Sequence, residues 1–382
     1  MRETTKSVSF ISVEKIEDNL IEGKINIAVD AKDTITAKVL HWEYLSGSDW
    51  QFYGEIEGMI GGSVQLTAGK RGMSGLIYYG SRFFEIFTTD HFDVSILLEH
   101  HPQKGICGNT NKEKTEKLET ELSPRSINSC DLSKVRVLVL YTNNALNAVN
   151  QNLSTITDRI NNGISIFNNA NIISNVNVAQ ANLELAEILP TDYIEYKLNF
   201  PSPNSSESNT YFDFVRNATK TAKIIYKADV LILLTAYPNW TETYGIAKRV
   251  KAENDDDAYA MVQIGYADAA YVFAHEVGHL LGGGHINSDG LNNSAHTYNF
   301  RTCGGSCPPQ FQKYTIMTSA TAQGNNIRAF RWSNPNVYDG IEATGTSSSN
   351  VAYRLGQTAQ TVAGFRESPN SENALMSGPL NV

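Results

Sequence analysis

Residues Ala274 to His285 read A-H-E-V-G-H-L-L-G-G-G-H, and this stretch decides how the rest of the chain is interpreted. His275 and His279 are four residues apart. On a helix this spacing places both imidazoles on one face, about one turn apart, so that they can hold one metal ion together. Glu276 follows the first histidine, where a carboxylate can reach a water on that metal, take its proton and return it later.

Gly282 predicts the end of this helix, because glycine readily takes the left-handed backbone conformation that ends helices. The turn then brings His285 back as a third ligand. Three neutral histidines leave a fourth tetrahedral position for water, which is the arrangement of a catalytic zinc. A surface helix with scattered histidines is the alternative, and three histidines in register around a glutamate argue against it.

The full pattern H-E-x-x-H-x-x-G-x-x-H resembles the signature of the metzincin zinc endopeptidases. That family has a methionine turn downstream, and Tyr314-Thr315-Ile316-Met317-Thr318 occupies the corresponding place. The resemblance implies that Met317 packs as an apolar floor under the three histidines and is not a ligand; an ordinary core methionine is the alternative. Ile286, Asn287 and Ser319 depart from the common subfamily markers. The chain therefore looks most like the reprolysin-like bacterial metzincins.

Composition limits the class of protein. The 382 residues suffice for two or more domains, and a hydrophobic fraction of 41% allows packed cores. A net charge of −9 with no basic stripe argues against nucleic-acid binding, and no apolar run is long enough for a membrane span. Met1 to Thr4 are not followed by an apolar signal core. We expect a secreted protein whose signal peptide is not present in this chain; a cytoplasmic protein is the alternative.

Residues 1–107 predict a β-rich module of its own. β-branched and aromatic stretches are separated by glycine-rich turns. The resemblance implies that this module is a pro-domain lying over the cleft as an intramolecular inhibitor, and an ordinary β domain tethered nearby is the alternative. The expected strands are Ile35–Leu45, Trp50–Met59, Ser63–Thr67 and Leu76–Phe87. The histidines of this region do not share metal-ligand spacing and are interpreted as surface or core residues: His41, His91, His100 and His101.

Residues 108–134 predict an exposed linker with the activation site. Lys112 to Glu121 is a run of Lys, Glu and Thr with little to bury. Cleavage near Arg125 or Lys134 would separate the module from the rest of the chain.

Four cysteines are present, and two interpretations of the first pair stay open. Metzincin pro-segments often carry a cysteine among small residues, and the resemblance implies that Cys107 occupies the open zinc position as a thiolate in the latent form only. A disulfide between Cys107 and Cys130 is the equal alternative. Cys303 and Cys307 bracket a flexible Gly-Gly-Ser loop, and a small disulfide between them is favoured.

Residues 135–366 predict the catalytic domain. Val135–Tyr141 and Ala228–Thr235 are strongly buried strands, and Ala145–Ala170 carries apolar residues at helical spacing. This order predicts an α/β (α+β) fold with crossover helices. The resemblance implies a twisted mixed sheet, an active-site helix beneath it and a small C-terminal subdomain after Gly282.

Further expectations concern the surroundings of the zinc helix. The resemblance makes Ala258–Gln263 the edge strand along which a peptide substrate adds as an antiparallel strand. Asp268 is the expected N-cap of the helix. Asp255 to Asp257 offer oxygen ligands for calcium, although a solvated acidic turn is the commoner case. Residues 367–382 are polar with Pro and Gly and predict a disordered tail.

The expected function is that of a zinc metalloendopeptidase, a hydrolase made as a latent zymogen. Zinc polarises the scissile carbonyl and acidifies its water, and Glu276 moves the proton from that water to the leaving amine. The alternatives are a non-catalytic zinc-containing binding module, against which the intact Glu276 argues, and a zinc amidase acting on small substrates. The expected partners are a protein or peptide substrate and the chain's own pro-domain. Cleavage specificity is not predicted.

Overall fold

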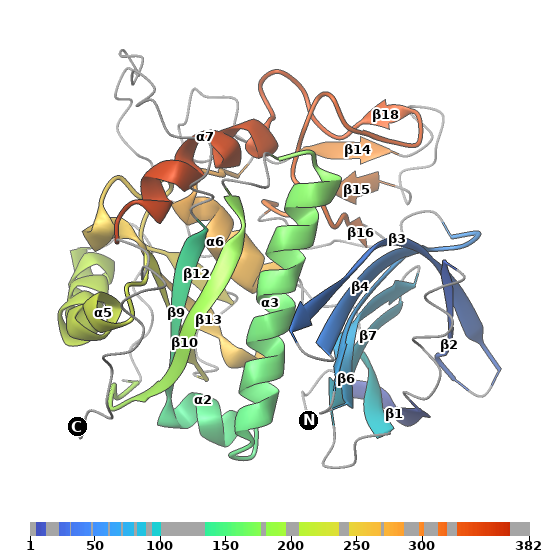
Figure 1. Cartoon of the computed structure of the whole chain (residues 1–382), viewed down its shortest axis with the longest axis horizontal. Coiled ribbons are helices and arrows are strands. Elements are labelled where there is room, and N and C mark those ends of the chain that lie inside the picture. The colour runs from blue at the N-terminus through green and yellow to red at the C-terminus, as the bar shows by residue number, and fades with distance from the viewer. Residues whose placement is uncertain are drawn as a thin grey trace.

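A computed structural model of the chain contains two large, separate sheets, with helices around the second (Figure 1). The structure describes residues 5–12, 23–30, 32–46, 49–59, 62–69, 72–79, 82–88, 94–100, 134–176, 181–195, 206–236, 244–268, 271–285, 298–301, 312–318 and 327–366.

The first sheet, which we call the β module, consists of eight antiparallel strands in the order β1-β8-β7-β6-β5-β4-β3-β2. Strands that follow one another in the chain are paired, except that β1 pairs with β8. Strands β3, β4 and β5 begin within one residue of predicted strands, whereas the single strand predicted for Leu76–Phe87 is two strands, β6 and β7. The strands are β1 (Thr5–Ser12), β2 (Lys24–Ala28), β3 (Thr34–Ser46), β4 (Asp49–Ile56), β5 (Ser63–Gly69), β6 (Gly72–Tyr79), β7 (Arg82–Thr88) and β8 (Val94–His100).

Residues 134–366 form the second part of the structure, which we call the α/β unit. Its sheet has the order β10-β9-β11-β13-β12, in which only β12 is antiparallel to its neighbour. In the middle of the sheet Leu233 lies opposite Leu140 on one side and Met261 on the other. The strands are β9 (Val135–Thr142), β10 (Leu183–Thr191), β11 (Val230–Thr235), β12 (Gly245–Ala247) and β13 (Tyr259–Gln263).

Helices cover both faces of this sheet, because alternate residues of each strand point to opposite faces. Val137 and Val139 belong to the core that includes residues of α3 (Leu153–Ile173), α6 (Val272–Leu280) and α7 (Val351–Ala363). Leu138 and Leu140 belong to the core that includes residues of α5 (Ser206–Ile225). In Figure 1, α3 stands between this sheet and the β module.

The remaining elements are short. Two small sheets follow the zinc helix: β14 (Asn299–Arg301), β15 (Gln312–Tyr314) and β16 (Ile327–Arg328) form one, and β17 (Tyr338–Asp339) and β18 (Glu342–Ala343) form the other. The 3-10 turns η1 (Asp255–Asp257) and η2 (Ile264–Tyr266) flank β13. The mixed sheet with its helices is the α/β arrangement expected from the sequence.

The helix predicted for Ala145–Ala170 is two helices, α2 (Asn143–Ala148) and α3. The break contains Asn150 and Gln151 in the left-handed backbone conformation, with φ of 55° and 60°. The side chain of Asn152 then accepts a hydrogen bond from the backbone N–H of Thr155 and begins α3. Turn and cap residues therefore interrupt an apolar pattern that continues through them.

Two further expectations were wrong. The segment Ala258–Gln263 is not the edge of the sheet: β13 lies between β11 and β12, and β12 is the edge strand. Asp268 is not the N-cap of the zinc helix, which begins at Val272 after Tyr271, with no side-chain cap hydrogen bond. The side chain of Asp268 instead accepts a hydrogen bond from Asn162 Nδ2 at 3.4 Å. This bond links the segment before the zinc helix to α3.

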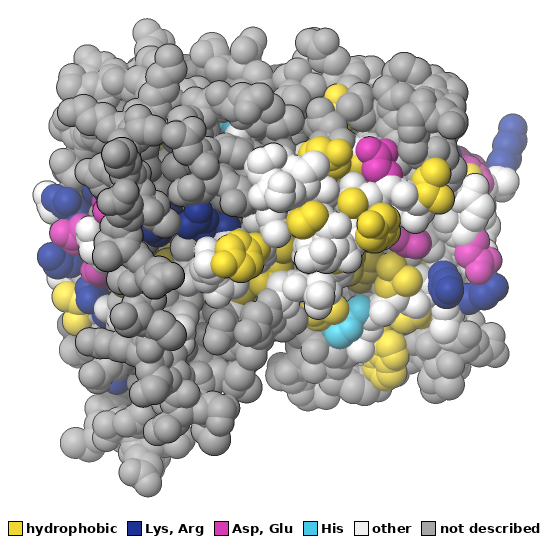
Figure 2. All heavy atoms as spheres, turned by 90° about the horizontal axis from the view of Figure 1, so that it is seen from above, with side chains coloured by type: hydrophobic (Ala, Val, Ile, Leu, Met, Phe, Trp, Pro, Cys, Tyr) yellow, Lys and Arg dark blue, Asp and Glu magenta, His cyan; other side chains and the backbone are white. Residues whose placement is uncertain are grey.

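The side of the molecule that carries α7 and β18 is shown from above in Figure 2. Its elements expose the large apolar side chains of Tyr338, Ile341 and Tyr353. Among the described residues of this face, apolar side chains are interspersed with charged ones of both signs (Figure 2). None of the described helices combines the length and apolarity needed to cross a membrane.

Candidate metal centre

The zinc helix α6 is buried along its whole length, and its end is fixed by Gly282. Gly282 has a φ of 93°, which a residue with a side chain rarely adopts. Its N–H donates to the carbonyl of His279 at 2.8 Å, and the N–H of Gly283 donates to the carbonyl of Gly278 at 2.8 Å. This is the turn that the glycine predicts, and it redirects the chain toward His285.

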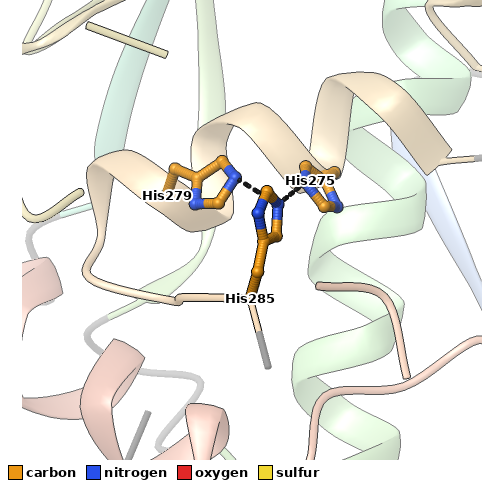
Figure 3. Close-up of side chains that lie close together, drawn as sticks. All are labelled: His275, His279 and His285. Carbon is orange, nitrogen blue, oxygen red and sulfur yellow. Dashed lines mark hydrogen bonds between the residues drawn. The ribbon is translucent and has the colours of Figure 1, made fainter. Parts of the chain in front are cut away.

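The three histidines of the motif converge on one point (Figure 3). His275 and His279 project from neighbouring turns of α6, and His285 reaches them from the segment after the turn. The Nε2 atom of His285 lies 3.0 Å from Nε2 of His275 and 3.0 Å from Nε2 of His279. All three rings are buried.

Backbone carbonyls orient two of these rings. Nδ1 of His275 lies 2.8 Å from the carbonyl oxygen of Ile316, and Nδ1 of His279 lies 2.7 Å from that of Gly283. A carbonyl only accepts, so each Nδ1 carries the ring proton and each Nε2 presents its lone pair to the common point. Zinc held at Zn–N distances of about 2.0–2.1 Å sets tetrahedral ligands roughly 3.3 Å apart. The donor set therefore fits a zinc ion.

Met317 packs against the backbone of α6 and its turn. It is completely buried, and a Cβ placed on Gly278 would come within 2.6 Å of its Sδ and 3.2 Å of the Trp332 ring. A Cβ on Gly283 would come within 3.1 Å of the Met317 side chain. The glycine between Val277 and His279 thus allows the methionine and the tryptophan to approach the zinc helix closely.

Glu276 is completely buried and lies against the edge strand. A Cβ placed on Gly245 of β12 would come within 2.6 Å of Glu276 Oε1 and 2.7 Å of Val272. The backbone of β12 therefore runs directly beside the carboxylate. The edge of the sheet and the expected general base meet at this glycine.

The acidic turn at η1 is surrounded by basic side chains. Asp255 lies 2.8 Å from Lys223 Nζ, and Asp256 lies 3.7 Å from Lys220 Nζ. Asp257 is 3.4 Å from an Arg249 Nη atom. Each carboxylate is thus within reach of a cation of the chain itself, which favours ion pairing over calcium binding in this turn.

Several predicted site residues lie outside the described residues. They are Cys107, Cys130, Cys303, Cys307, Ile286, Asn287 and Ser319, together with Arg125 and the rest of the segment 101–133 and the tail 367–382.

Sequence reasoning missed the groups that orient the site. The carbonyls of Ile316 and Gly283 belong to the backbone, and the residue type does not predict which backbone carbonyl will bind a ring nitrogen. Ile316 directly precedes the methionine of the turn. Gly245 belongs to a strand of three residues, Gly245–Ala247, which is too short to show alternation. The one signal was a glycine in an apolar segment, which often marks close backbone approach.

Comparison with known proteins agrees with this geometry. The model of metallo-peptidase family M12 matches residues 131–331, which is more than half of the chain. The chain is 31% identical over 237 residues to the peptidyl-Asp metalloendopeptidase of Stenotrophomonas maltophilia (strain R551-3), covering 61% of this chain and 52% of that protein. It is 28% identical over 233 residues to the protein of the same name from Xanthomonas campestris pv. campestris, with the same coverage of 61% and 52%.

The chain therefore spans about half the length of the curated relatives that it matches. Among solved structures, metalloproteinase-II from Bacteroides fragilis matches 72% of this chain and 87% of its own chain at 11% identity and a TM-score of 0.46. That likeness is too low to carry an argument about this fold.

Proposed function

Because this chain belongs to metallo-peptidase family M12, we propose that it is a zinc-dependent endopeptidase acting on proteins or peptides. The observation that carries the proposal is the convergence of three imidazole Nε2 atoms beside a buried glutamate and the edge of a sheet. His275, His279 and His285 would hold the zinc. When bound, zinc supplies a Lewis acid that polarises the scissile carbonyl and makes water more acidic.

Glu276 acts as the general base and then as the general acid. Its carboxylate takes the proton of the attacking water and gives it to the leaving amine. Burial beside β12 keeps bulk water away from the carboxylate and fixes its position relative to the strand. The proton therefore moves between groups that the fold holds in place.

The edge strand β12 orients the substrate. An extended peptide adds to the free edge of a sheet through main-chain hydrogen bonds, and β12 has a described strand, β13, on one side only. A peptide paired with β12 runs past Gly245, next to Glu276. This role passes to β12 from the segment Ala258–Gln263, which is internal.

Substitution of the base tests the reaction. Glu276→Gln is expected to retain zinc and fold while losing about a hundred- to ten-thousand-fold in turnover of a denatured protein substrate. Zinc content by elemental analysis and the far-UV circular dichroism spectrum serve as controls. Cleavage at the wild-type rate would remove Glu276 from the mechanism.

Two alternative functions make different predictions. A non-catalytic zinc-containing binding module gives no new chain ends with any protein mixture, although it binds zinc. An amidase for small substrates cleaves short amides but not proteins, and the position of β12 at the edge of the described sheet argues for an extended peptide instead. Sequencing the new ends in a digested protein mixture separates the three and also gives the specificity. The matched relatives are named peptidyl-Asp metalloendopeptidases. The first comparison is therefore between cleavage of bonds next to aspartate and cleavage of bonds next to asparagine.

Latency is a further part of the proposal. Cys107, which follows the β module, would keep the chain inactive until the segment between module and α/β unit is cut and Cys107 can leave the zinc site. Cys107→Ser is then expected to make the full-length chain active without proteolysis, whereas Cys130→Ser leaves it latent. If a Cys107–Cys130 disulfide is present instead, both variants behave alike and mass spectrometry of the unreduced chain shows the link. We also propose that the protein is secreted, which suits a zymogen that another protease activates.

A further inference from the structure

Strands β4, β6 and β7 of the β module are buried on both faces. Neighbouring residues of one strand point to opposite faces, and in each strand both neighbours are buried. Phe52, Ile77 and Phe84 belong to the core of the module itself. Their neighbours Tyr53, Leu76 and Phe83 belong to the core of the α/β unit. An antiparallel sheet that faces water on one side shows alternation of buried and polar residues instead.

The second face of the module lies against α3. Gln65 Nε2 donates to the backbone carbonyl of Asn162 at 3.4 Å, and Ser74 Oγ lies 3.3 Å from Asn162 Oδ1. Arg159 of α3 reaches Glu85 of β7 at 3.5 Å, and both side chains are almost completely buried. Removing one member of this pair while the surface stays covered would leave a buried, unpaired charge.

The contact continues to the first turn of the zinc helix. Tyr271 immediately precedes α6 and has a φ of 59°, a left-handed conformation that is unusual for a bulky residue and persists only where the surroundings hold it. Tyr78 of the module lies 5.3 Å from Tyr271 between ring centroids, and Phe330 lies 5.4 Å from it. Tyr53 of the module stacks on Phe330 at 4.5 Å. Two module tyrosines thus hold the aromatic group that fixes the start of the helix.

A second link runs through Arg159. Its guanidinium donates to the carbonyl of Ile264 in η2, close before the zinc helix, and lies 5.1 Å from the centroid of the Phe87 ring. The approach to α6 is therefore tied to β7 by one side chain.

From these contacts we infer that the β module is a permanent part of the α/β unit that holds the start of the zinc helix in position. It stays bound when the chain between the two is cut, and the retention of zinc depends on it. Module and unit meet as the halves of one core, as in obligate interfaces. The inference concerns attachment and metal retention, and it does not depend on the proposed peptidase activity.

Cutting the chain tests the attachment. A recognition sequence for a site-specific protease is inserted after residue 118 in the Cys107→Ser chain, and the cut is made under a phosphine reductant. Neither a disulfide nor a thiolate on zinc can then hold the fragments together. The two fragments are expected to elute together from a size-exclusion column at micromolar concentration. Elution of a free module beside a folded α/β unit would overturn the inference.

Two adjacent tyrosines test the link to zinc. Tyr78 packs against Tyr271, whereas Tyr79 packs against the module's own core and donates to Asp33. Tyr78→Ala is expected to speed the loss of zinc to excess chelator on the order of tenfold, the size of effect seen when groups that orient metal ligands are removed. Tyr79→Ala is expected to change that rate less than Tyr78→Ala does.

Hydrogen exchange of the module's backbone shows whether it is still folded in each variant. If Tyr78→Ala unfolds it, Tyr78→Leu preserves an apolar strand residue, removes the ring contact and is expected to release zinc faster in the same way. Equal zinc release from a Tyr78 variant with a folded module and from the wild type would overturn the positioning role. Loss of peptidase activity alone, with zinc retention and co-elution unchanged, would count against the proposed function and not against this inference.

Discussion

The β module and the α/β unit both bury histidine, and they satisfy it differently. In the module, His100 Nε2 lies 3.0 Å from a carboxylate oxygen of Glu85, and both side chains are fully buried. In the α/β unit, His275 and His279 each present Nε2 to the Nε2 atom of His285 at 3.0 Å. One imidazole beside a carboxylate can donate its ring proton to a carboxylate oxygen. Three imidazoles around one point cannot all be hydrogen-bonded to one another in this way, because His285 cannot donate one proton to both neighbours.

The difference shows what separates a structural histidine from a candidate ligand. Burial is the same in both places, so burial does not decide the role. The direction of the second ring nitrogen decides it: the Nδ1 atoms of His275 and His279 are bound to carbonyls, which turns their Nε2 lone pairs inward. A cation at the centre satisfies all three rings at once.

The prediction with the largest expected effect tests the histidine cluster of the α/β unit. His279→Ala removes one of three ligands, and its zinc content is expected to fall from one per chain to near zero after dialysis, measured by elemental analysis. His100→Gln is the matched control, since its amide can still bind Glu85, and it is expected to retain one zinc per chain. Equal zinc in the two variants would show that the histidine cluster is not the metal site.

A prediction with a smaller expected effect tests the packing beneath the zinc helix. Gly278→Ala places a methyl group 2.6 Å from Met317 Sδ, and the overpacking is expected to lower the free energy of unfolding by about 1–3 kcal/mol. The midpoint of urea denaturation, followed by tryptophan fluorescence, measures it. Gly265→Ala is the control, because a Cβ there meets nothing within 4 Å, and it is expected to change the stability by less than about 0.5 kcal/mol. Midpoints that coincide would mean that Met317 can move away from the helix.

The sequence predicted those features that residue type and spacing carry. The histidine motif placed three side chains on one point, since a spacing of four fixes a helical face and Gly282 fixes the turn. Alternation of β-branched and aromatic residues predicted strands such as β4 and β5 closely. Both signals depend on side chains and on neighbours in the chain, which a sequence shows directly.

The rest depends on contacts between distant segments. The resemblance placed the edge strand at Ala258–Gln263, whereas this segment forms the internal strand β13, and the edge strand of the described sheet, β12, has only three residues. The packing of Tyr78 on Tyr271 and of Tyr53 on Phe330 could not be predicted, because an alternating strand does not say what covers its second face. Tyr271 begins the helix without a side-chain cap, in a conformation maintained by packing and not by its residue type.

Two buried carboxylates continue the comparison between the regions, because their pKa values shift in opposite directions. In the module, hydrogen bonds from Arg82 lower the pKa of Glu99 from its usual value of 4.5 to about 2. In the α/β unit, burial raises the pKa of Asp229 from 3.8 to about 7, although the backbone N–H groups of Arg136 and Arg366 bind it at 2.9 and 3.0 Å. A guanidinium outweighs desolvation in the first case, and two peptide N–H groups do not outweigh it in the second.

The smallest expected effect follows from these shifts and concerns pH. Folded Asp229 retains its proton up to about pH 7, whereas the unfolded chain releases it near 3.8, so its contribution to stability is complete at low pH and is lost as the pH rises through 7. Glu99 acts in the opposite sense: its contribution is present above about 4.5 and is lost as the pH falls through 2. Asp229→Asn should therefore flatten the urea midpoint between pH 4 and 7, and Glu99→Gln should flatten it only below about pH 4.5. Curves for Asp229→Asn and wild type that stay parallel from pH 4 to 8 would mean that Asp229 is ionised in the folded chain, and that its two N–H donors do outweigh its burial.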